Sequence, residues 1–308
     1  MAKTKIEFVC RECGSSHHQW AGQCLDCKEW NTLEEVIISQ ATSSKPESLK
    51  DLPSSKVQNL SEIKSQNNHR LSTGLSELDR TLGGGLVDGS VVLIGGDPGI
   101  GKSTLILQAI AAINASSTTL YVSGEESAEQ VSDRAIRLGI KEDILFIGET
   151  HLEKIIKISK DTRPKVIVID SIQTMVTDLS NSAPGSVTQV RDCAAQLTQY
   201  AKQTNTILLM IGHVTKGGAL AGPRILEHMV DAVLYFEGDA GGRYRIIRAV
   251  KNRFGAVNEI SVFAMGEKGL QQVSNPSSIF LSNQENPSSG SMVMVTREAT
   301  RPLLVEIQ

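Results

Sequence analysis

The segment Val91-Val92-Leu93-Ile94-Gly95-Gly96-Asp97-Pro98-Gly99-Ile100-Gly101-Lys102-Ser103 decides the fold of this chain. From Gly96 to Ser103 it fits the pattern G-x-x-x-x-G-K-S/T at every fixed position, after an apolar strand and before a helical stretch. Glycines let the backbone wrap around a phosphate, and the helix adds its positive dipole end. A chance glycine turn is the alternative. The segment predicts a P-loop that binds ATP with Mg²⁺.

The predicted nucleotide contacts all belong to this loop or to the start of its helix. They are Gly96, Asp97, Pro98, Gly99, Ile100, Gly101, Lys102, Ser103 and Thr104. Lys102 is expected to reach the β- and γ-phosphates, and the Ser103 hydroxyl to coordinate Mg²⁺. Thr104 is expected to touch the α-phosphate.

Two acids are predicted to complete the catalytic set with Lys102. The run Lys165–Asp170 predicts a buried strand that ends beside the P-loop, so Asp170 should hold Mg²⁺ through a water. Glu125 follows another predicted strand and is expected to be the base that positions water, with Glu126 as its neighbour or substitute. The alternatives are a turn residue at a strand end and a helix start decorated with acids.

Composition favours an α/β fold. The chain has 308 residues, of which 40% are hydrophobic and only 4% aromatic, so the core must be aliphatic. Such a core suits a mostly parallel sheet with helices on both faces. Strands are predicted at Val91–Ile94, Leu120–Ser123, Ile144–Ile147, Val166–Ile169, Ile207–Ile211, Ala232–Phe236, Tyr244–Val250 and Ile260–Phe263. Helices are predicted at Lys102–Ala112, Ala128–Leu138, Leu152–Ser159 and Val187–Thr204, and the last strands should form antiparallel hairpins.

The chain divides into four predicted parts. Residues 1–35 form a four-cysteine module, and residues 36–68 form a linker rich in Ser, Lys, Gln and Asn. Residues 69–274 form the ATPase core. Residues 275–308 begin polar and end in an apolar run, which predicts the start of a truncated further domain. A genuine C-terminal strand is the alternative.

The cysteine spacing predicts a structural zinc site. Two C-x-x-C pairs are separated by ten residues, and four thiolates close a tetrahedral site with no open position. The predicted ligands are Cys10, Cys13, Cys24 and Cys27. Free thiols or disulfides are the alternative. His17 and His18 are further candidate ligands that the cysteines make unnecessary, and Trp20 and Trp30 are expected to pack beside the metal. Cys193 is expected in the core.

Charge and hydropathy exclude some classes of protein. The formal net charge is −3, so contact with nucleic acid would require a local basic patch. No apolar run approaches the roughly 20 residues that span a bilayer, and the N-terminus lacks the apolar region of a signal peptide. The chain is therefore expected to be cytoplasmic, where cysteines serve as metal ligands or free thiols.

Two segments before the P-loop carry a resemblance to a known class. Leu71-Ser72-Thr73-Gly74-Leu75-Ser76-Glu77-Leu78-Asp79 and Gly83-Gly84-Gly85-Leu86, with the paired acids, resemble the RecA/DnaB/KaiC class of P-loop ATPases. With the cysteine cluster and Lys251-Asn252-Arg253-Phe254-Gly255, the chain resembles the RadA (Sms) family of bacterial DNA repair proteins over nearly its whole length. Residues 275–308 resemble the entry to that family's Lon-protease-like domain.

The resemblance implies a RecA-like core in a homo-hexameric ring on single-stranded and branched DNA. The ring would be an ATP-driven helicase that promotes branch migration in recombinational repair, together with the RecA recombinase. The nucleotide would lie between subunits, with Lys251 and Arg253 of one subunit at the γ-phosphate of the next. These two residues end the densest basic stretch, which also holds Arg243, Arg245 and Arg248. An exposed, solvated edge strand is the alternative for that stretch.

The glycine-rich segment after Ile207–Ile211 is the predicted DNA loop. Lys216 and Arg224 would follow the DNA backbone without sequence preference, and His213 would sense the γ-phosphate. A packed, hydrogen-bonded histidine is the alternative. Residues 174–186 would form a second DNA loop, although they carry no Lys or Arg. Neither loop has the aromatic residues that stack on bases.

Two other functions remain open at this point. One is an ATP-gated assembly switch of the KaiC type that does not bind DNA, against which the basic stretch and the cysteine pairs argue. The other is a recombinase that forms helical filaments, which should carry a filament-forming element at its N-terminus. ATP hydrolysis with and without single-stranded DNA separates the first from a DNA motor, and electron microscopy separates rings from filaments.

Overall fold

The computed structural model describes residues 5–10, 15–38, 59, 70–180, 182–213, 223–238, 242–281 and 290–307. Within these residues the helices are α1 (Ser76–Thr81), α2 (Lys102–Asn114), α3 (Ala128–Leu138), α4 (Leu152–Thr162), α5 (Val187–Thr204), α6 (Pro223–Glu227) and α7 (Ser277–Phe280). The strands are β1 (Lys5–Cys10), β2 (Ser16–His17), β3 (Leu33–Ile38), β4 (Arg70–Leu71), β5 (Leu86–Val87), β6 (Val91–Gly96), β7 (Thr119–Ser123), β8 (Leu145–Gly148), β9 (Val166–Asp170), β10 (Ile207–His213), β11 (Ala232–Glu237), β12 (Tyr244–Asn252), β13 (Ile260–Gly266), β14 (Gly269–Gln272), β15 (Met292–Glu298) and β16 (Arg301–Ile307).

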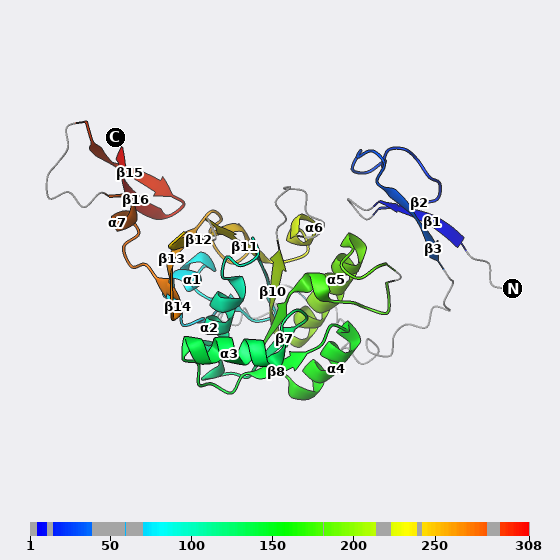
Figure 1. The fold of residues 1–308 in the computed structure, drawn as a ribbon, viewed down its shortest axis with the longest axis horizontal. Helices are drawn as coiled ribbons and strands as arrows, with labels where there is room; N and C mark the ends of the chain where they lie inside the picture. The colour runs from blue at the N-terminus through cyan, green and yellow to red at the C-terminus, as the bar shows by residue number, and fades with distance from the viewer. Residues whose placement is uncertain are drawn as a thin grey trace.

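The central sheet has nine strands within the described residues, in the order β14-β13-β12-β11-β6-β10-β9-β7-β8 (Figure 1). From β11 to β8 neighbouring strands are parallel, and from β11 to β14 they are antiparallel. Strands β6, β7 and β9 are buried along their whole length. Uninterrupted apolar runs are what a parallel sheet covered on both faces requires.

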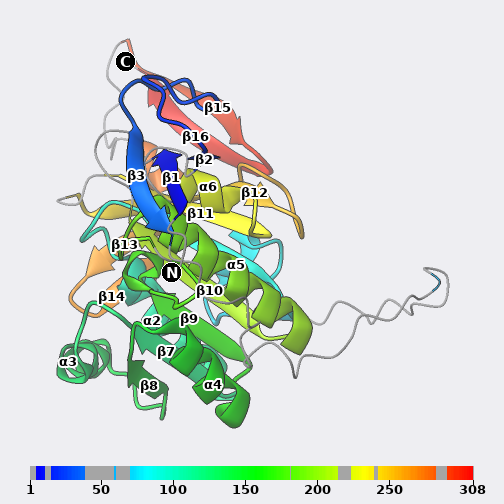
Figure 2. The same cartoon turned by 90° about the vertical axis from the view of Figure 1, so that its right-hand side faces the viewer.

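Each face of the sheet has its own apolar core, because successive side chains of a strand point to opposite faces. Val92 and Ile94 of β6 pack with apolar residues of α1, α2 and α3. Val91 and Leu93 pack with those of α4 and α5 on the other face. Figure 2 shows the helices lying along both sides of the sheet. The predicted α/β fold, with a mostly parallel sheet and helices on both faces, is confirmed.

The predicted elements agree closely with the observed ones. Helices α3 and α5 have the predicted bounds, and the antiparallel end of the sheet is present. The alternative of an exposed edge strand for the basic stretch is wrong, because β12 lies between β11 and β13. The short helix α1 and the strands β4, β5 and β14 have no counterpart among the predictions.

The N-terminal part forms a small three-stranded antiparallel sheet in the order β2-β1-β3. Among its described residues, the apolar cluster buries Cys10, Cys24 and Leu33. The expectation that Trp20 and Trp30 pack beside the metal is wrong, since these residues are 61% and 68% exposed. The described part of the small sheet therefore buries few hydrocarbon side chains.

At the other end of the chain, β15 and β16 form an antiparallel hairpin, with partners from Met292↔Ile307 to Glu298↔Arg301. Much of its apolar surface is exposed, including Met292 and Val295. Its turn holds Ala299 at a positive φ of 50° and lies against the core. No helix in the described ranges combines the length and apolar character needed to cross a membrane.

Candidate active site

The P-loop joins the end of β6 to the start of α2, at the carboxyl edge of the parallel strands. Gly101 precedes α2 with a φ of 113°, and a Cβ there would lie 2.7 Å from Met265 Cε. Only glycine satisfies both constraints. A cavity of about 330 Å³ opens here and is lined by Pro98, Gly99, Gly101, Lys102, Ser103, Thr104, Glu125, Glu126, Arg134, Arg137, Asp170 and His213. The structure thus brings most predicted nucleotide contacts together with both predicted catalytic acids.

Lys102 is folded back into the loop that carries it. Its Nζ donates hydrogen bonds of 2.8 Å to the carbonyl oxygens of Gly96 and Asp97. Burial lowers the pKa of Lys102 to about 8, against the opposing effect of the Asp170, Asp97 and Glu125 carboxylates. An incoming phosphate would replace the two carbonyl groups as the ammonium's partner and would favour its charged form.

Asp170 ends β9 beside the P-loop, as predicted. The Tyr121 hydroxyl on β7 donates a hydrogen bond to its carboxylate. Burial raises the pKa of Asp170, while hydrogen bonds from Tyr121 and from the Ser103 hydroxyl lower it. Asp170 and Ser103 therefore present oxygen atoms side by side, which is the donor set that Mg²⁺ prefers. The peptide bond between Asp170 and Ser171 is cis.

Glu125 lies between two polar partners on neighbouring strands. Its Oε1 accepts a hydrogen bond from the Ser171 hydroxyl and lies 3.2 Å from His213 Nε2. The hydrogen bond from His213 lowers the pKa of Glu125, against burial, with Ser171 acting in the same direction. The base candidate is therefore held ionised by the residue that ends β10.

Glu126 has a different environment from Glu125. Arg134 on α3 binds its carboxylate with both guanidinium ends, one at 2.6 Å. A capping box between Ser127 and Gln130 starts α3 directly after the acids, so helix and strand fix Arg134 opposite Glu126. The paired carboxylate is poorly suited to act as a base. Arg134 and Arg137, which line the cavity, were missed because nothing in α3 distinguishes them from surface charges.

Arg245 on β12 was also missed as a site residue. Its side chain is 2% exposed, and its Nε donates a 2.9 Å hydrogen bond to the carbonyl oxygen of Ile100 in the P-loop. This buried guanidinium therefore fixes the backbone of the P-loop through a hydrogen bond to one of its carbonyl groups. The alternation of charged and apolar residues along β12 could have suggested that one arginine points inward, although not toward which loop.

The motif Lys251-Asn252-Arg253-Phe254-Gly255 lies at the amino-terminal ends of the parallel strands, whereas the P-loop of the same chain lies at their carboxyl-terminal ends. Asn252 pairs with Ala232 at the start of β11, and Arg253 binds Asp231 at 3.1 Å. Asp231 in turn lies beside Val91, the first residue of β6, whereas the P-loop follows the last. Five residues of strand separate the two ends by about 16 Å. The motif cannot reach its own nucleotide cavity.

The predicted DNA-loop residues fall largely outside the described part of the chain. Lys216 lies in residues 214–222, which the structure does not describe. The predicted zinc ligand Cys13 lies in residues 11–14, which are also outside the described residues. Arg224 belongs to α6, but its side chain is not described. Residues 174–180 and 182–186 of the second predicted loop follow the turn after β9, and Thr177 there binds Glu153. The predicted sensor His213 lines the cavity, where its ring contacts the Glu125 carboxylate.

The three described cysteines of the N-terminal part converge. The sulfur atoms of Cys10, Cys24 and Cys27 lie within 4.8 Å of one another, and those of Cys10 and Cys27 are 3.6 Å apart. That separation is far too long for a disulfide. It matches the edge of about 3.8 Å in a tetrahedron of sulfurs around zinc, given a Zn–S distance near 2.3 Å. The residues fit a tetrahedral thiolate site.

Cys24 is already prepared as a thiolate ligand. Its Sγ lies 3.2 Å from Ser15 Oγ and 3.5 Å from His17 Nε2. Burial opposes ionisation, but hydrogen bonds from Ser15, the backbone and His17 together lower the pKa of Cys24 to about 5. In contrast, burial raises the pKa of Cys193 to about 12, as expected for an inert core thiol.

Comparison with known families gives two matches. Residues 58–219 match the AAA domain family, and residues 8–35 match the rubredoxin metal binding domain family. The fold and the site therefore define a P-loop ATPase that carries an N-terminal metal-binding ribbon.

Curated relatives narrow the assignment. The chain is 54% identical over 309 residues to the DNA repair protein RadA of Pseudomonas aeruginosa, covering 100% of this chain and 68% of that relative. Identity is 52% with the protein of the same name from Escherichia coli K12 and 48% with that from Bacillus subtilis 168, with the same coverage. The chain belongs to the RadA family of DNA repair proteins.

Proposed function

We propose that this chain is a DNA-dependent ATPase that moves on single-stranded DNA as a ring and promotes branch migration in recombinational repair. The observation that carries the proposal is the contact between Glu125 and His213. His213 is the last described residue before residues 214–222, the predicted DNA loop with Lys216. DNA that moves this segment would move His213 and thereby change the environment of the base.

The proposed chemistry assigns a role to the main polar residues at the cavity. Lys102 neutralises the β- and γ-phosphates, and Ser103 with Asp170 holds Mg²⁺, which supplies charge stabilisation to the transferring phosphoryl group. Glu125 accepts a proton from the attacking water. The backbone from Gly96 to Thr104 cradles the phosphates. Tyr121 orients the Asp170 carboxylate.

The position of Lys251 and Arg253 supports a shared active site. Both lie about one strand length from their own cavity and cannot reach the nucleotide of their own P-loop. To act on a neighbour, Arg253 would exchange Asp231, and Lys251 the carbonyl oxygen of Glu227, for its phosphate. We propose that they complete the γ-phosphate site of a neighbour in a homo-hexameric ring, with Asn252, Phe254 and Gly255 holding them. A cation delivered in this way is worth about 10³–10⁵ in turnover.

The N-terminal ribbon, residues 1–35, is proposed to hold structural zinc through Cys10, Cys13, Cys24 and Cys27. Residues 36–68 would link it to the core at 69–274, and residues 275–308 would begin a further Lon-protease-like domain. Branched DNA and the RecA recombinase are the proposed partners. DNA contact would rest on local basic residues, because the formal net charge of the chain is −3.

The decisive experiment measures ATP hydrolysis by the purified chain with and without single-stranded DNA, and unwinding of a forked duplex, at two salt concentrations. A DNA motor should hydrolyse ATP faster on DNA, lose that stimulation at high salt, and lose unwinding in Lys102→Ala. A KaiC-like switch would ignore DNA. Unwinding that persists in Lys102→Ala would refute the motor, and filaments instead of rings in electron microscopy would refute the proposed assembly.

A further inference from the structure

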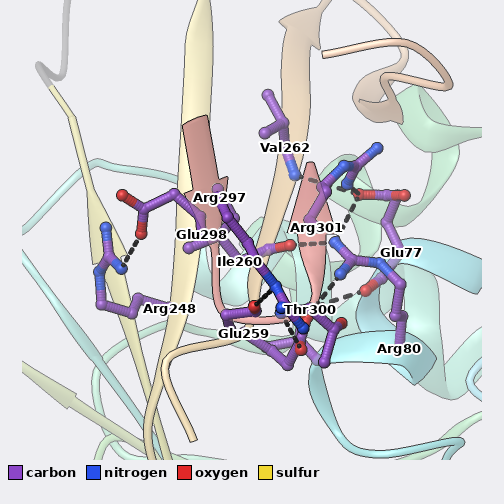
Figure 3. Close-up of polar contacts among 12 residues, drawn as sticks. Glu77, Arg80, Arg248, Glu259, Ile260, Val262, Arg297, Glu298, Thr300 and Arg301 are labelled. Atoms are coloured by element: carbon purple, nitrogen blue, oxygen red, sulfur yellow. Dashed lines mark hydrogen bonds and ion pairs between the residues drawn. The ribbon is translucent and has the colours of Figure 1, made fainter. Parts of the chain in front are cut away.

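The turn of the β15–β16 hairpin is fastened to the core by a closed set of polar contacts (Figure 3). Arg301 Nη1 binds Glu77 at 2.6 Å, and Arg80 Nη2 lies 3.5 Å from the same carboxylate. Arg80 Nη1 binds Glu259 at 2.7 Å, and Glu259 accepts a 3.0 Å hydrogen bond from the backbone N–H of Thr300. These contacts therefore connect Arg301 of the hairpin, through Glu77, Arg80 and Glu259 of the core, back to Thr300, which is its neighbour in the chain.

Two of these residues belong to α1, a helix of only six residues. The set contains two carboxylates and two guanidinium groups, and the side chains of Glu259, Glu77 and Arg301 are only 5%, 12% and 14% exposed. Buried carboxylates need their partners, because water does not replace them. The hairpin thus supplies one of the two cations that α1 and the start of β13 require.

The end of α1 also holds the Lys251–Gly255 motif. The carbonyl oxygen of Thr81 accepts a 3.3 Å hydrogen bond from Asn252 Nδ2, and Asn252 Oδ1 accepts one of 2.9 Å from the N–H of Phe254. Gly83, at a φ of 82°, lies so near that a Cβ on it would be 2.9 Å from Gly255 Cα. Thr81 follows Arg80 directly, so the ion pairs and the motif are attached to consecutive residues.

We propose that Arg301 is a positioning residue for the Lys251–Gly255 motif, acting through Glu77 and Arg80 of α1. This inference rests on the proposed role of the motif at a neighbouring subunit's nucleotide. The hairpin would in this way set how well each subunit completes the active site of the next.

The physical reason lies in the competition for Arg80. Without Arg301, Arg80 is the one cation left in the described network for both Glu77 and Glu259, and Glu77 keeps only the N–H of Val262 as a further donor there. Arg80 is then drawn toward Glu77, away from Glu259 and from the Ile260 carbonyl oxygen that it also binds. A shift there moves the Thr81 carbonyl and the backbone of Gly83, against which Asn252 and Gly255 pack. Misplacement of a catalytic group by 1 Å costs up to about 10²-fold in rate.

The hairpin offers a matched control. Arg248 on β12 also binds the hairpin, through Glu298 at 3.0 Å, and binds Glu237 at 2.7 Å. These pairs are more exposed, and none of them touches α1. Arg248 lies on β12, the strand that leads to the motif. Arg248→Gln therefore loosens the same hairpin without disturbing Arg80.

The first test compares steady-state ATP hydrolysis of Arg301→Gln, Arg301→Lys and Arg248→Gln in the whole chain with single-stranded DNA. We expect kcat of Arg301→Gln to fall about 10- to 100-fold at unchanged KM for ATP. Arg301→Lys keeps the charge and should recover most of the rate. Arg248→Gln should stay within about twofold, as for an exposed pair. Melting temperature and nucleotide affinity report whether the variants are folded.

The second test uses mixed assemblies made by co-expression of two differently tagged chains. Lys102→Ala subunits cannot hydrolyse ATP but present an intact motif, whereas Arg301→Gln subunits keep an intact P-loop. If Arg301 acts on the neighbour, mixed assemblies should hydrolyse several-fold faster than the sum of the separate variants. Arg253→Gln mixed with Lys102→Ala is the positive control.

Each outcome decides something different. Rescue of Arg253→Gln without rescue of Arg301→Gln overturns this inference and leaves the shared active site standing. No rescue of Arg253→Gln removes the role of the motif at a neighbour, and this inference with it. A fall in nucleotide affinity for Arg301→Gln, or an equal loss of kcat in Arg248→Gln, would mean that the hairpin only supports the fold.

Discussion

The ATPase core and the N-terminal ribbon of this chain are stabilised by different means. The core buries two apolar clusters, one on each face of its sheet, built from strands such as β6 and β9 and the helices that cover them. The ribbon buries Cys10, Cys24 and Leu33 and leaves both of its tryptophans in solvent. Hydrocarbon burial stabilises the first, whereas we expect the second to need metal–sulfur bonds.

The difference also separates fold from chemistry. In the core, the catalytic groups lie at or just after the ends of buried strands and at the start of α2, so we expect that they can be changed without unfolding it. In the ribbon, the cysteine sulfurs that would bind the metal are also the groups that would hold the fold together. Changes in the core should therefore affect ATP hydrolysis far more than stability, and changes in the ribbon should do the reverse.

Lys102→Ala should remove ATP hydrolysis, by about 10³-fold or more, because the principal cation at the phosphates is lost. Melting of the core should change little, since Lys102 Nζ binds only carbonyl oxygens of its own loop. Turnover assays with differential scanning calorimetry check both parts. A large fall in melting temperature would contradict the separation of chemistry from fold.

Glu125→Gln should lower kcat by about 10²–10⁴-fold, the usual contribution of a general base. Nucleotide binding should persist, because the amide can keep the hydrogen bonds to Ser171 and His213. Glu126→Gln is the matched control, and its loss should be smaller since Arg134 already occupies that carboxylate. Equal losses in the two variants would mean that Glu125 is not the base.

Binding of ATP should weaken as pH rises through about 8, the pKa of Lys102 without nucleotide. Phosphate favours the charged ammonium, so above this pH the lysine must take up a proton when ATP binds. The affinity then falls by up to about tenfold per pH unit. Calorimetric titrations between pH 7 and 9.5 in two buffers measure the affinity and the proton uptake. Absence of uptake at pH 9 would exclude this coupling.

His213→Ala should move the acid side of the kcat–pH profile to higher pH. The hydrogen bond from His213 lowers the pKa of Glu125, so its removal raises that pKa and protonates the base at a higher pH. A stopped assay from pH 4.5 to 8 detects the shift. An unchanged acid side would show that another group sets it.

Chelation of the metal should have the smallest effect on the nucleotide site and the largest on the ribbon. Amide exchange of residues 15–38 should rise to that of an unfolded segment, while residues 91–123 stay protected and ATP still binds. Cys24→Ser should reproduce the result without a chelator. Loss of protection in β6 would contradict the independence of the two parts.

The fold could be predicted because its cause is local in sequence. Apolar runs such as Val166–Asp170 and the pattern from Gly96 to Ser103 specify a strand and a phosphate loop by themselves, so the site formed where strand ends meet. Contacts that depend on register could not be predicted in the same way. Nothing near Arg245 indicates that it faces Ile100, and nothing near Arg301 indicates Glu77, because 224 residues separate that pair. The exposure of Trp20 could not be predicted either, because the cysteine spacing says nothing about which side of the ribbon an indole occupies.

Strand β12 has a consequence for timing. Near its start, Arg245 binds the P-loop of its own subunit, and its last two residues, Lys251 and Asn252, begin the motif proposed to act on the next subunit. If that motif completes a neighbour's site, the nine-residue interior strand β12 would couple nucleotide binding in one subunit to ATP hydrolysis in the next. Hydrolysis would then proceed around the assembly from each subunit to the next in order.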